Sequence, residues 1–151
     1  MNTDEDFDQM VKDLQRRIDQ EEELIYSKIV IREYKNPDKF GTLQNPDAVG
    51  EITGSCGDTM KISIKVSDDK ITTARFWTDG CGATVASGNM LLKMAVGKTL
   101  DEAFNISIKE LIKALDGLPK EHHHCAVLAV DTLRKTIKNY REKNLFKKKK
   151  T

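Results

Sequence analysis

An alternating segment near the middle of the chain constrains the fold more than any other feature. Over residues 60–66, apolar side chains occupy every second position: Met60, Ile62, Ile64 and Val66 alternate with Lys61, Ser63 and Lys65. Successive side chains of a β-strand point to opposite faces of its sheet, so the pattern predicts a strand with one buried and one solvated face. A sheet with a solvated face is expected to be antiparallel, because parallel sheets are covered on both faces.

The neighbouring segments supply partners for this strand. Residues 67–70, Ser-Asp-Asp-Lys, predict a hairpin turn, and residues 71–78, rich in threonine and aromatic residues, predict the returning strand. A weaker strand is expected over residues 50–53. Three antiparallel strands with one solvated face need a layer of helices on the other face.

The second half of the chain carries helical signals. Residues 84–96 form a segment of apolar and small residues that ends near Gly97, a suitable C-cap. Two capping boxes, a Ser or Thr followed three residues later by Glu, begin at Thr99 and Ser107 and predict short helices. A longer helix is expected over residues 125–143. The predicted fold class is therefore α+β, with a three-stranded antiparallel sheet and helices packed on it.

The two ends of the chain carry opposite charge. Residues 1–25 contain nine acidic and three basic residues, a net charge of −6, and residues 131–151 contain nine basic and two acidic residues, a net charge of +7. Apolar residues recur at helical spacing in the first segment, which predicts an amphipathic helix with a solvated acidic face; a partner-docking arm is the alternative. We expect three parts: an acidic N-terminal helical arm at 1–25, the main domain at 26–143 and a basic flexible tail at 144–151.

Composition argues against several classes of protein. The chain has 25 Lys and Arg against 24 Asp and Glu, and a net charge of +1 argues against a dedicated nucleic-acid binder. No apolar run approaches the ~18 residues of a membrane span, and the acidic start does not resemble a secretory signal, so no membrane association is expected. Three cysteines cannot form a closed set of disulfides, which favours the reducing cytoplasm.

The three cysteines lie at expected connections or element ends. Cys56 precedes the alternating strand, Cys81 follows the returning strand and Cys125 begins the last helix, so none is expected at a periodic apolar position. Glycines beside Cys56 and Cys81 allow backbone amides to approach a sulfur atom closely. We interpret the three as ligands of one metal ion or cluster; a reactive cysteine that carries a persulfide and unrelated structural cysteines are the alternatives.

Two residues are candidates for a fourth ligand. Asp58 lies two positions from Cys56, so both side chains point to the same side of an extended segment; otherwise it is an ordinary turn residue. His124 precedes Cys125, so both can address one cavity, whereas the two preceding histidines are expected in a solvated turn. Three thiolates with a carboxylate or an imidazole suit a soft or borderline metal ion. The steps of 25 and 44 residues between the cysteines are not those of zinc ribbons or ferredoxins.

Six short motifs resemble the iron–sulfur cluster assembly scaffolds of the IscU/NifU N-terminal family. The resemblance extends from Tyr26 to Tyr140. In chain order the motifs are Tyr26-Ser27 leading to Asn36-Pro37; Asn45-Pro46-Asp47-Ala48-Val49-Gly50; Cys56-Gly57-Asp58; Gly80-Cys81-Gly82-Ala83; Gly97-Lys98-Thr99-Leu100-Asp101-Glu102-Ala103; and His124-Cys125. The histidine before the third cysteine and the step of 44 residues resemble the Isc type rather than the Suf type.

The resemblance implies a scaffold or carrier protein rather than an enzyme. In that family a [2Fe-2S] cluster is built from iron and from sulfur supplied by a cysteine desulfurase, and is then handed to apo iron–sulfur proteins. Zinc commonly occupies the site when no cluster is present. Carried to this sequence, the ligands are Cys56, Cys81 and Cys125, with Asp58 and His124 competing for the fourth place. The position of Asp58 is associated with cluster release.

The resemblance also implies an iron donor and a chaperone of the Hsp70 type as partners. The chaperone-recognition stretch of the family, Leu-Pro-Pro-Val-Lys, is reduced in this chain to Leu118-Pro119 followed by Lys-Glu-His. Two other functions stay open: a sulfur-transfer protein that passes a persulfide from one cysteine to an acceptor, and a protein whose zinc is purely structural.

Overall fold

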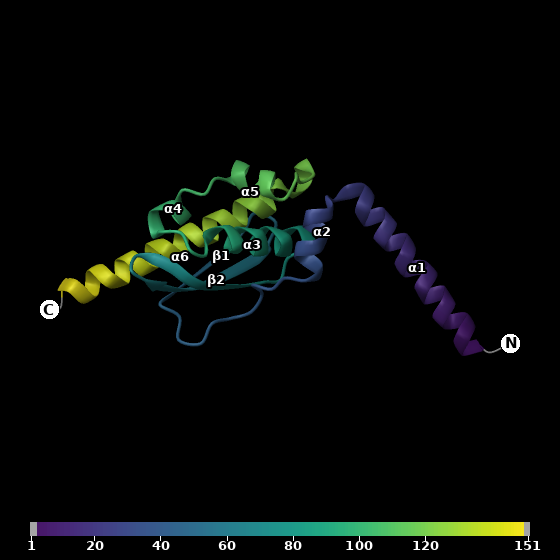
Figure 1. Ribbon diagram of the computed structural model, residues 1–151, viewed down its shortest axis with the longest axis horizontal. Coiled ribbons are helices and arrows are strands. Elements are labelled where there is room, and N and C mark those ends of the chain that lie inside the picture. The colour runs from purple at the N-terminus through teal and green to yellow at the C-terminus, as the bar shows by residue number, and fades with distance from the viewer. Residues whose placement is uncertain (1–2, 150–151) are drawn as a thin grey trace.

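A β-sheet lies in the body of the molecule (Figure 1), and it has three strands. The computed structural model describes residues 3–149. The strands are β1 (Ala48–Thr53), β2 (Thr59–Ser67) and β3 (Lys70–Thr78). They are antiparallel and lie in the order β1-β2-β3, so the predicted sheet is confirmed. Strand β1 begins two residues earlier than the sequence pattern indicates.

A two-residue turn sets the register of β2 and β3. Asp68 and Asp69 both have left-handed backbone angles, with φ values of 53° and 63°, as a type I′ hairpin requires. In the resulting register Ile62 of β2 pairs with Phe76 of β3. Because both side chains are fully buried, this register directs the apolar face of the alternating strand toward the core.

Helices account for most of the remaining described residues. Their bounds are α1 (Thr3–Ile25), α2 (Lys28–Lys35), α3 (Gly82–Ala95), α4 (Leu100–Phe104), α5 (Ile108–Ala114), the 3-10 turn η1 (Lys120–His122) and α6 (His123–Lys149). All the helices expected after the sheet are present. Thr99 opens α4 with a complete capping box, and the Ser107 hydroxyl accepts a hydrogen bond from the Glu110 amide at the start of α5.

The sequence analysis did not anticipate helix α2. Its N-cap is Ser27, whose hydroxyl accepts a hydrogen bond from the Val30 amide at 3.0 Å. Only Val30 and Glu33 are buried in this helix. The Glu33 carboxylate accepts hydrogen bonds from Asn89 and Lys93 of α3. Helix α2 is therefore joined to α3 by a buried carboxylate as well as by apolar contacts of Val30, Ile29 and Tyr34 with the core.

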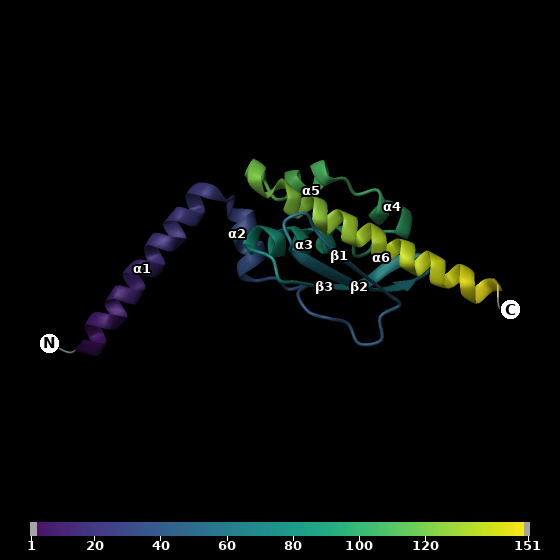
Figure 2. The ribbon, with the colours of Figure 1, turned by 180° about the vertical axis from the view of Figure 1, so that it is seen from behind.

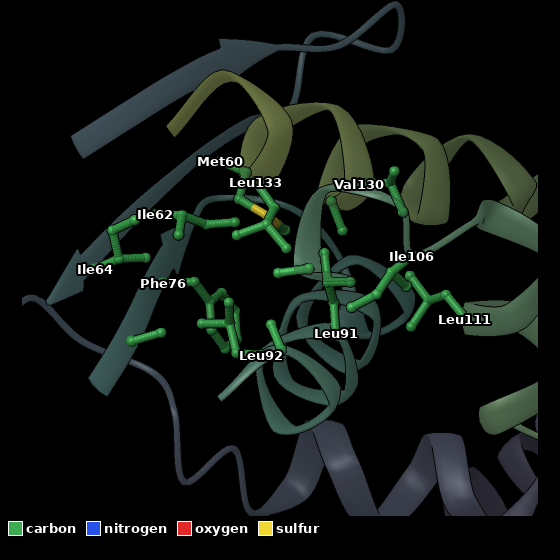
Figure 3. Packing of buried hydrophobic residues seen from close by; sticks show 14 of the residues in the cluster. Met60, Ile62, Ile64, Phe76, Leu91, Leu92, Ile106, Leu111, Val130 and Leu133 are labelled. Atoms are coloured by element: carbon green, nitrogen blue, oxygen red, sulfur yellow. The ribbon is translucent and has the colours of Figure 1, made fainter. Parts of the chain in front are cut away.

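The core lies between the sheet and helices α3 and α6 (Figures 2 and 3). It contains large, fully buried side chains from the sheet and from both helices: Met60, Ile62, Phe76, Leu91, Leu92 and Leu133. Helix α6 approaches β1 so closely that a Cβ placed on Gly50 would lie 2.3 Å from Thr136 Oγ1. Gly50 thus permits the contact between strand and helix on which the layered α+β fold depends.

Helix α1 extends away from the rest of the molecule (Figures 1 and 2). It has no buried residue, and apolar side chains such as Phe7 and Leu14 are exposed. Its last turns are attached to α2 by ion pairs of Lys35 with Asp19 (3.3 Å) and Glu22 (3.8 Å). The predicted N-terminal helix is confirmed, while its role as a separate arm stays a prediction.

The C-terminal helix is longer than the sequence pattern indicates. Helix α6 begins at His123 and continues to Lys149, so residues 144–149, which were expected in a flexible tail, are helical. Residues 150–151 lie outside the described part of the chain. Neither α6 nor any other helix within residues 3–149 is long and apolar enough to span a membrane.

Candidate metal centre

Cys81 and Cys125 lie together where two helices begin. Cys81 is the N-cap residue of α3, in the connection from β3, and Cys125 lies in the first turn of α6. Their sulfur atoms and a ring nitrogen of His122 all lie within 4.8 Å of one another. Thiolates and imidazoles are common ligands of zinc and iron. This Cys-His-Cys group, defined by these three residues, could therefore hold a metal ion.

The Thr84 hydroxyl lies between the two sulfur atoms of the group. It donates a hydrogen bond to Cys125 Sγ at 3.2 Å and lies 3.7 Å from Cys81 Sγ. Thr84 is fully buried. The sequence analysis did not select it, although its position three residues after Cys81 places it beside that residue on the first turn of a helix. Thr84 therefore links α3 to Cys125 of α6 at the site.

Cys125 is fully buried, which corrects the expectation that no cysteine occupies a periodic apolar position. It belongs to the buried face of α6, which continues with Ala129 and Leu133 at four-residue steps. Burial raises the pKa of the Cys125 thiol to about 11; the hydrogen bond from Thr84 opposes this rise, and Cys81 adds to it. The thiol is therefore protonated at neutral pH and must lose its proton when it binds a metal.

His122 also differs from the sequence analysis, which placed it in a solvated turn. Its ring is half-buried, its Nε2 lies 3.1 Å from the Tyr26 hydroxyl, and the two ring centroids are 5.5 Å apart. Its Nδ1 is buried and has no hydrogen-bond partner among the described residues. His123 donates a hydrogen bond from Nε2 to the Leu118 carbonyl at 3.0 Å. The expectation of a solvated turn is therefore wrong, because both rings pack against the fold.

Two tyrosines support this end of the site. Tyr26 lies between α1 and α2, and its ring meets that of Tyr34 edge-on with the centroids 6.4 Å apart. Tyr34 packs against Gly82, where a Cβ would lie 3.2 Å from the tyrosine ring. Burial, and then the neighbouring thiol groups of Cys81 and Cys125, raise the pKa of the Tyr26 hydroxyl. That hydroxyl is therefore protonated at neutral pH and can donate or accept a hydrogen bond.

The other predicted ligands lie outside the Cys-His-Cys group. His124 adjoins it, with Nε2 at 3.5 Å from Cys125 Sγ. Cys56 is exposed in the turn between β1 and β2, and Asp58 lies at the end of that turn. The structure therefore brings together two of the three predicted cysteines, and of the two candidates for the fourth ligand it places His124 beside a sulfur atom.

A hollow lies between the turn that carries Cys56 and the start of α6. It has a volume of about 490 Å³, and its lining includes Gly54 and Ser55 of the turn and His124 of the helix. The negative charge of Asp58 also contributes, after burial and the nearer groups, to the raised pKa of Cys125. The turn with Cys56 and Asp58 is therefore close to the group that contains the other two cysteines.

Comparison with known proteins gives matches over most of the chain. A family model described as the NifU-like N terminal domain matches residues 25–147. The iron-sulfur cluster assembly scaffold protein IscU 1 of Archaeoglobus fulgidus is 42% identical over 121 residues, which cover 80% of this chain and 79% of that protein. The scaffold protein IscU of Escherichia coli strain K12 is 40% identical over 125 residues, which cover 80% of this chain and 97% of that protein.

Solved structures with the same fold are also known. A protein of Fervidobacterium islandicum AW-1, assigned as an iron-sulfur cluster assembly scaffold of the SUF system, superposes with a TM-score of 0.65 at 24% identity, over 76% of this chain and 97% of that chain. A nitrogen-fixing NifU-like protein (N-terminal) of Brucella abortus superposes with a TM-score of 0.63 at 23% identity, over 79% and 96%. At these identities the likeness concerns the fold alone, and it confirms the predicted fold class.

Proposed function

This chain belongs to the NifU-like N-terminal domain family, and we propose that it is a scaffold on which a [2Fe-2S] cluster is assembled and from which the cluster passes to apo-proteins. The observation that carries the proposal is the meeting of Cys81 and Cys125 at the starts of α3 and α6, beside the turn that holds Cys56. We propose that the scaffold domain comprises residues 26–143, with residues 1–25 and 144–151 as appended arm and tail.

The proposed ligands of the cluster are Cys56, Cys81 and Cys125, with Asp58 or His124 in the fourth place. The Cys-His-Cys group supports two of these thiolates, and the hollow beside His124 supports the approach of the third. Three thiolates bind iron strongly, whereas a carboxylate or an imidazole in the fourth place is a ligand of different softness. It can leave first and admit a thiolate of the acceptor protein, which gives a site suited to holding its cargo briefly.

Sulfur reaches the scaffold, in this proposal, from a cysteine desulfurase. Cys56 and Cys81 are exposed whereas Cys125 is buried, so we expect one of the exposed thiols to receive the sulfur. Its thiolate attacks the outer sulfur of the donor's persulfide; an S–S bond forms on the scaffold, and the donor cysteine leaves as a thiolate. The scaffold contributes a thiol and a place to hold the product, and we propose that it is a carrier rather than an enzyme.

The other proposed partners are apo iron–sulfur proteins as acceptors, an iron donor and a chaperone of the Hsp70 type. Leu118 and Pro119, which resemble the start of the chaperone-recognition stretch, lie in the connection before η1. We propose a cytoplasmic location, since all three cysteines are free thiols. The near-neutral charge continues to argue against a nucleic-acid partner.

The exposure of Cys56 favours one alternative function, that of a sulfur-transfer protein. A thiol that lies in an open turn, outside the Cys-His-Cys group, could carry a persulfide to an acceptor without any iron. A purely structural zinc is the other alternative, and it predicts that a chelator unfolds the protein. The continuous core between the sheet, α3 and α6 argues against a fold that depends on zinc.

Anaerobic incubation with ferrous iron and sulfide tests the proposal. A scaffold gains the visible absorption of a cluster with equal amounts of bound iron and sulfide, and an added apo-ferredoxin acquires that absorption in turn. A sulfur-transfer protein accepts labelled sulfur from a persulfide donor on one cysteine and passes it on without iron. Persulfide transfer by a protein that binds no iron and sulfide together would contradict the scaffold proposal.

A further inference from the structure

Helix α1 carries a stripe of apolar side chains that face solvent in the described part of the chain. The stripe consists of four residues at steps of four, three and four, each between 41% and 61% exposed: Phe7, Val11, Leu14 and Ile18. The helix projects from the body of the molecule (Figures 1 and 2), and none of its residues is buried. Contiguous exposed apolar residues with a charged rim indicate an interaction surface, and this spacing is that of a coiled-coil seam.

The charge of α1 is distributed so that it spares this seam. Residues 7–18 contain three basic and two acidic residues, a net charge of +1, whereas residues 4–6 and 19–23 contain seven acidic residues and no basic residue. Glu21 occupies the next seam position, so the apolar seam ends at Ile18. A strongly basic partner would match the two acidic ends rather than the stripe, whereas a second copy of the same short seam matches the stripe itself.

We propose that α1 pairs with α1 of a second copy of this chain, as an antiparallel two-helix coil. In this pair Phe7 of one helix lies opposite Ile18 of the other, and Val11 lies opposite Leu14, so the four apolar residues of both helices are covered at once. The removal of this apolar surface from water drives the association. The pairing surface is separate from the Cys-His-Cys group, and the proposal does not rest on the scaffold function.

The residues that flank the seam fit the antiparallel direction. In an antiparallel pair the same edges of the two helices meet, so Asp8 of one helix lies beside Gln15 of the other along one edge, and Met10 lies beside Arg17 along the second edge. Like charges therefore do not meet beside the seam. The acidic segments 4–6 and 19–23 come together only at the two ends of the pair, where water and salt screen their repulsion.

The antiparallel direction also keeps the two domains apart. The centre of the pair lies between residues 12 and 13, and a helix rises about 1.5 Å per residue, so Ile25 lies about 19 Å from the centre and Thr3 of the other copy about 14 Å. Each helix therefore ends before it reaches the domain of the other copy. The two Cys-His-Cys groups lie at opposite ends of the pair, so the pairing leaves both open to other proteins. In a parallel pair, by contrast, Glu21 would face its own counterpart in the seam.

Sedimentation velocity of the whole chain in reducing, metal-free buffer tests the inference, because thiols and metal ions then play no part. An interface of this size belongs to the weak and transient class, so we expect a reversible monomer–dimer equilibrium between about 5 µM and about 500 µM. Higher salt should strengthen the dimer, since it screens the acidic ends. A protein that stays monomeric over this range leaves the stripe to a different protein and overturns the inference, and so does a dimer that salt dissociates.

Two seam variants with opposite charges test the direction of the pair. Val11→Lys and Leu14→Glu should each weaken the dimer by about 100-fold or more, because each change acts twice in a symmetric pair. Gln9→Lys and Gln20→Glu are the matched controls, since they place the same charges on the face of α1 away from the seam. They should dimerise as the unchanged protein does.

A mixture of the Val11→Lys and Leu14→Glu proteins should dimerise again. In the antiparallel pair the new lysine lies opposite the new glutamate, while the unchanged leucine and valine still meet; in a parallel pair neither contact forms. Circular dichroism of each variant shows whether α1 stays helical. Seam variants that dimerise like the controls, or a mixture of helical variants that remains monomeric, overturn the proposed pairing.

Discussion

Replacement of Glu33 by alanine should destabilise the protein strongly, although this residue is charged and the sequence marks it in no way. Its side chain is only 2% exposed and accepts hydrogen bonds from Asn89, from Lys93 at 2.9 Å and from Arg32 at 3.0 Å. The carboxylate joins α2 to α3, and the same α2 carries Tyr34 onto Gly82 beside the metal centre. Loss of this connection should therefore loosen the fold near the site.

The expected cost follows from the exposure of the three donors. Lys93 and Arg32 are 40% and 61% exposed, so water can solvate them again and each bond contributes about 0.5 kcal/mol. Asn89 is fully buried, and its Nδ2 group would keep only the bond that it donates to Asp38 at 3.1 Å; loss of the other charged acceptor costs about 2 kcal/mol. The sum is about 3 kcal/mol of unfolding free energy, which corresponds to a fall of about 10 °C in Tm.

Urea unfolding of the metal-free protein, followed by circular dichroism at pH 7, measures this loss. Glu51→Ala, which removes an exposed glutamate from β1, is the control and should leave the unfolding midpoint nearly unchanged. A Glu33→Ala protein as stable as that control would refute the reasoning that a buried carboxylate holds α2 in place.

The same contact has a definite pH dependence. Burial alone would raise the pKa of Glu33, but the hydrogen bonds from Lys93, Asn89 and Arg32 outweigh it and hold the pKa below its usual 4.5. A lowered pKa in the folded state means that the unfolded chain takes up the proton first as the pH falls. The stability difference between wild type and Glu33→Ala should be complete above pH 4.5 and shrink as the pH falls through the folded-state pKa.

Two further predictions concern the site and the N-terminal helix. Asp58→Ala should lengthen the lifetime of a bound cluster and slow its transfer, because the variant lacks the hard carboxylate that competes for iron and attracts water. If the cluster absorption of this variant decays as fast as that of the wild type or faster, while its circular dichroism spectrum is unchanged, Asp58 has no role in cluster release. Deletion of residues 2–18 should change the unfolding free energy by less than about 1 kcal/mol, since no residue of α1 is buried; a clear loss in urea unfolding would show that this helix packs on the domain in solution.

The sheet could be predicted from the sequence because its signals are local. The alternation over residues 60–66 fixes which face is buried, and the Asp68-Asp69 pair fixes the turn, so each strand follows from its own residues and near neighbours. Helix α2 could not be predicted in this way. It has eight residues, and one of its two buried side chains is the charged Glu33, whose partners in α3 lie more than fifty positions away.

The site was only partly predictable from the sequence, because some of its contacts join residues that lie far apart in the chain. The glycine-flanked cysteines identify the chemistry, but the burial of Cys125 results from the packing of α6 against α3, through a contact between residues 41 positions apart. The His122 ring packs against Tyr26, which lies 96 positions away. No local pattern distinguishes one of three consecutive histidines, because the difference between them arises only when the N-terminal part of the domain meets η1 and the start of α6.

Anaerobic reconstitution of three single variants tests the central claim most directly. Cys56→Ser, Cys81→Ser and Cys125→Ser should each fold, as judged by circular dichroism; at the buried position the Thr84 hydroxyl can bond the new serine. Each should nevertheless fail to hold a stable cluster when given iron and sulfide, while the unchanged protein gains the cluster absorption with equal amounts of bound iron and sulfide. A normal cluster in any one of the three variants would contradict the assignment of three thiolate ligands.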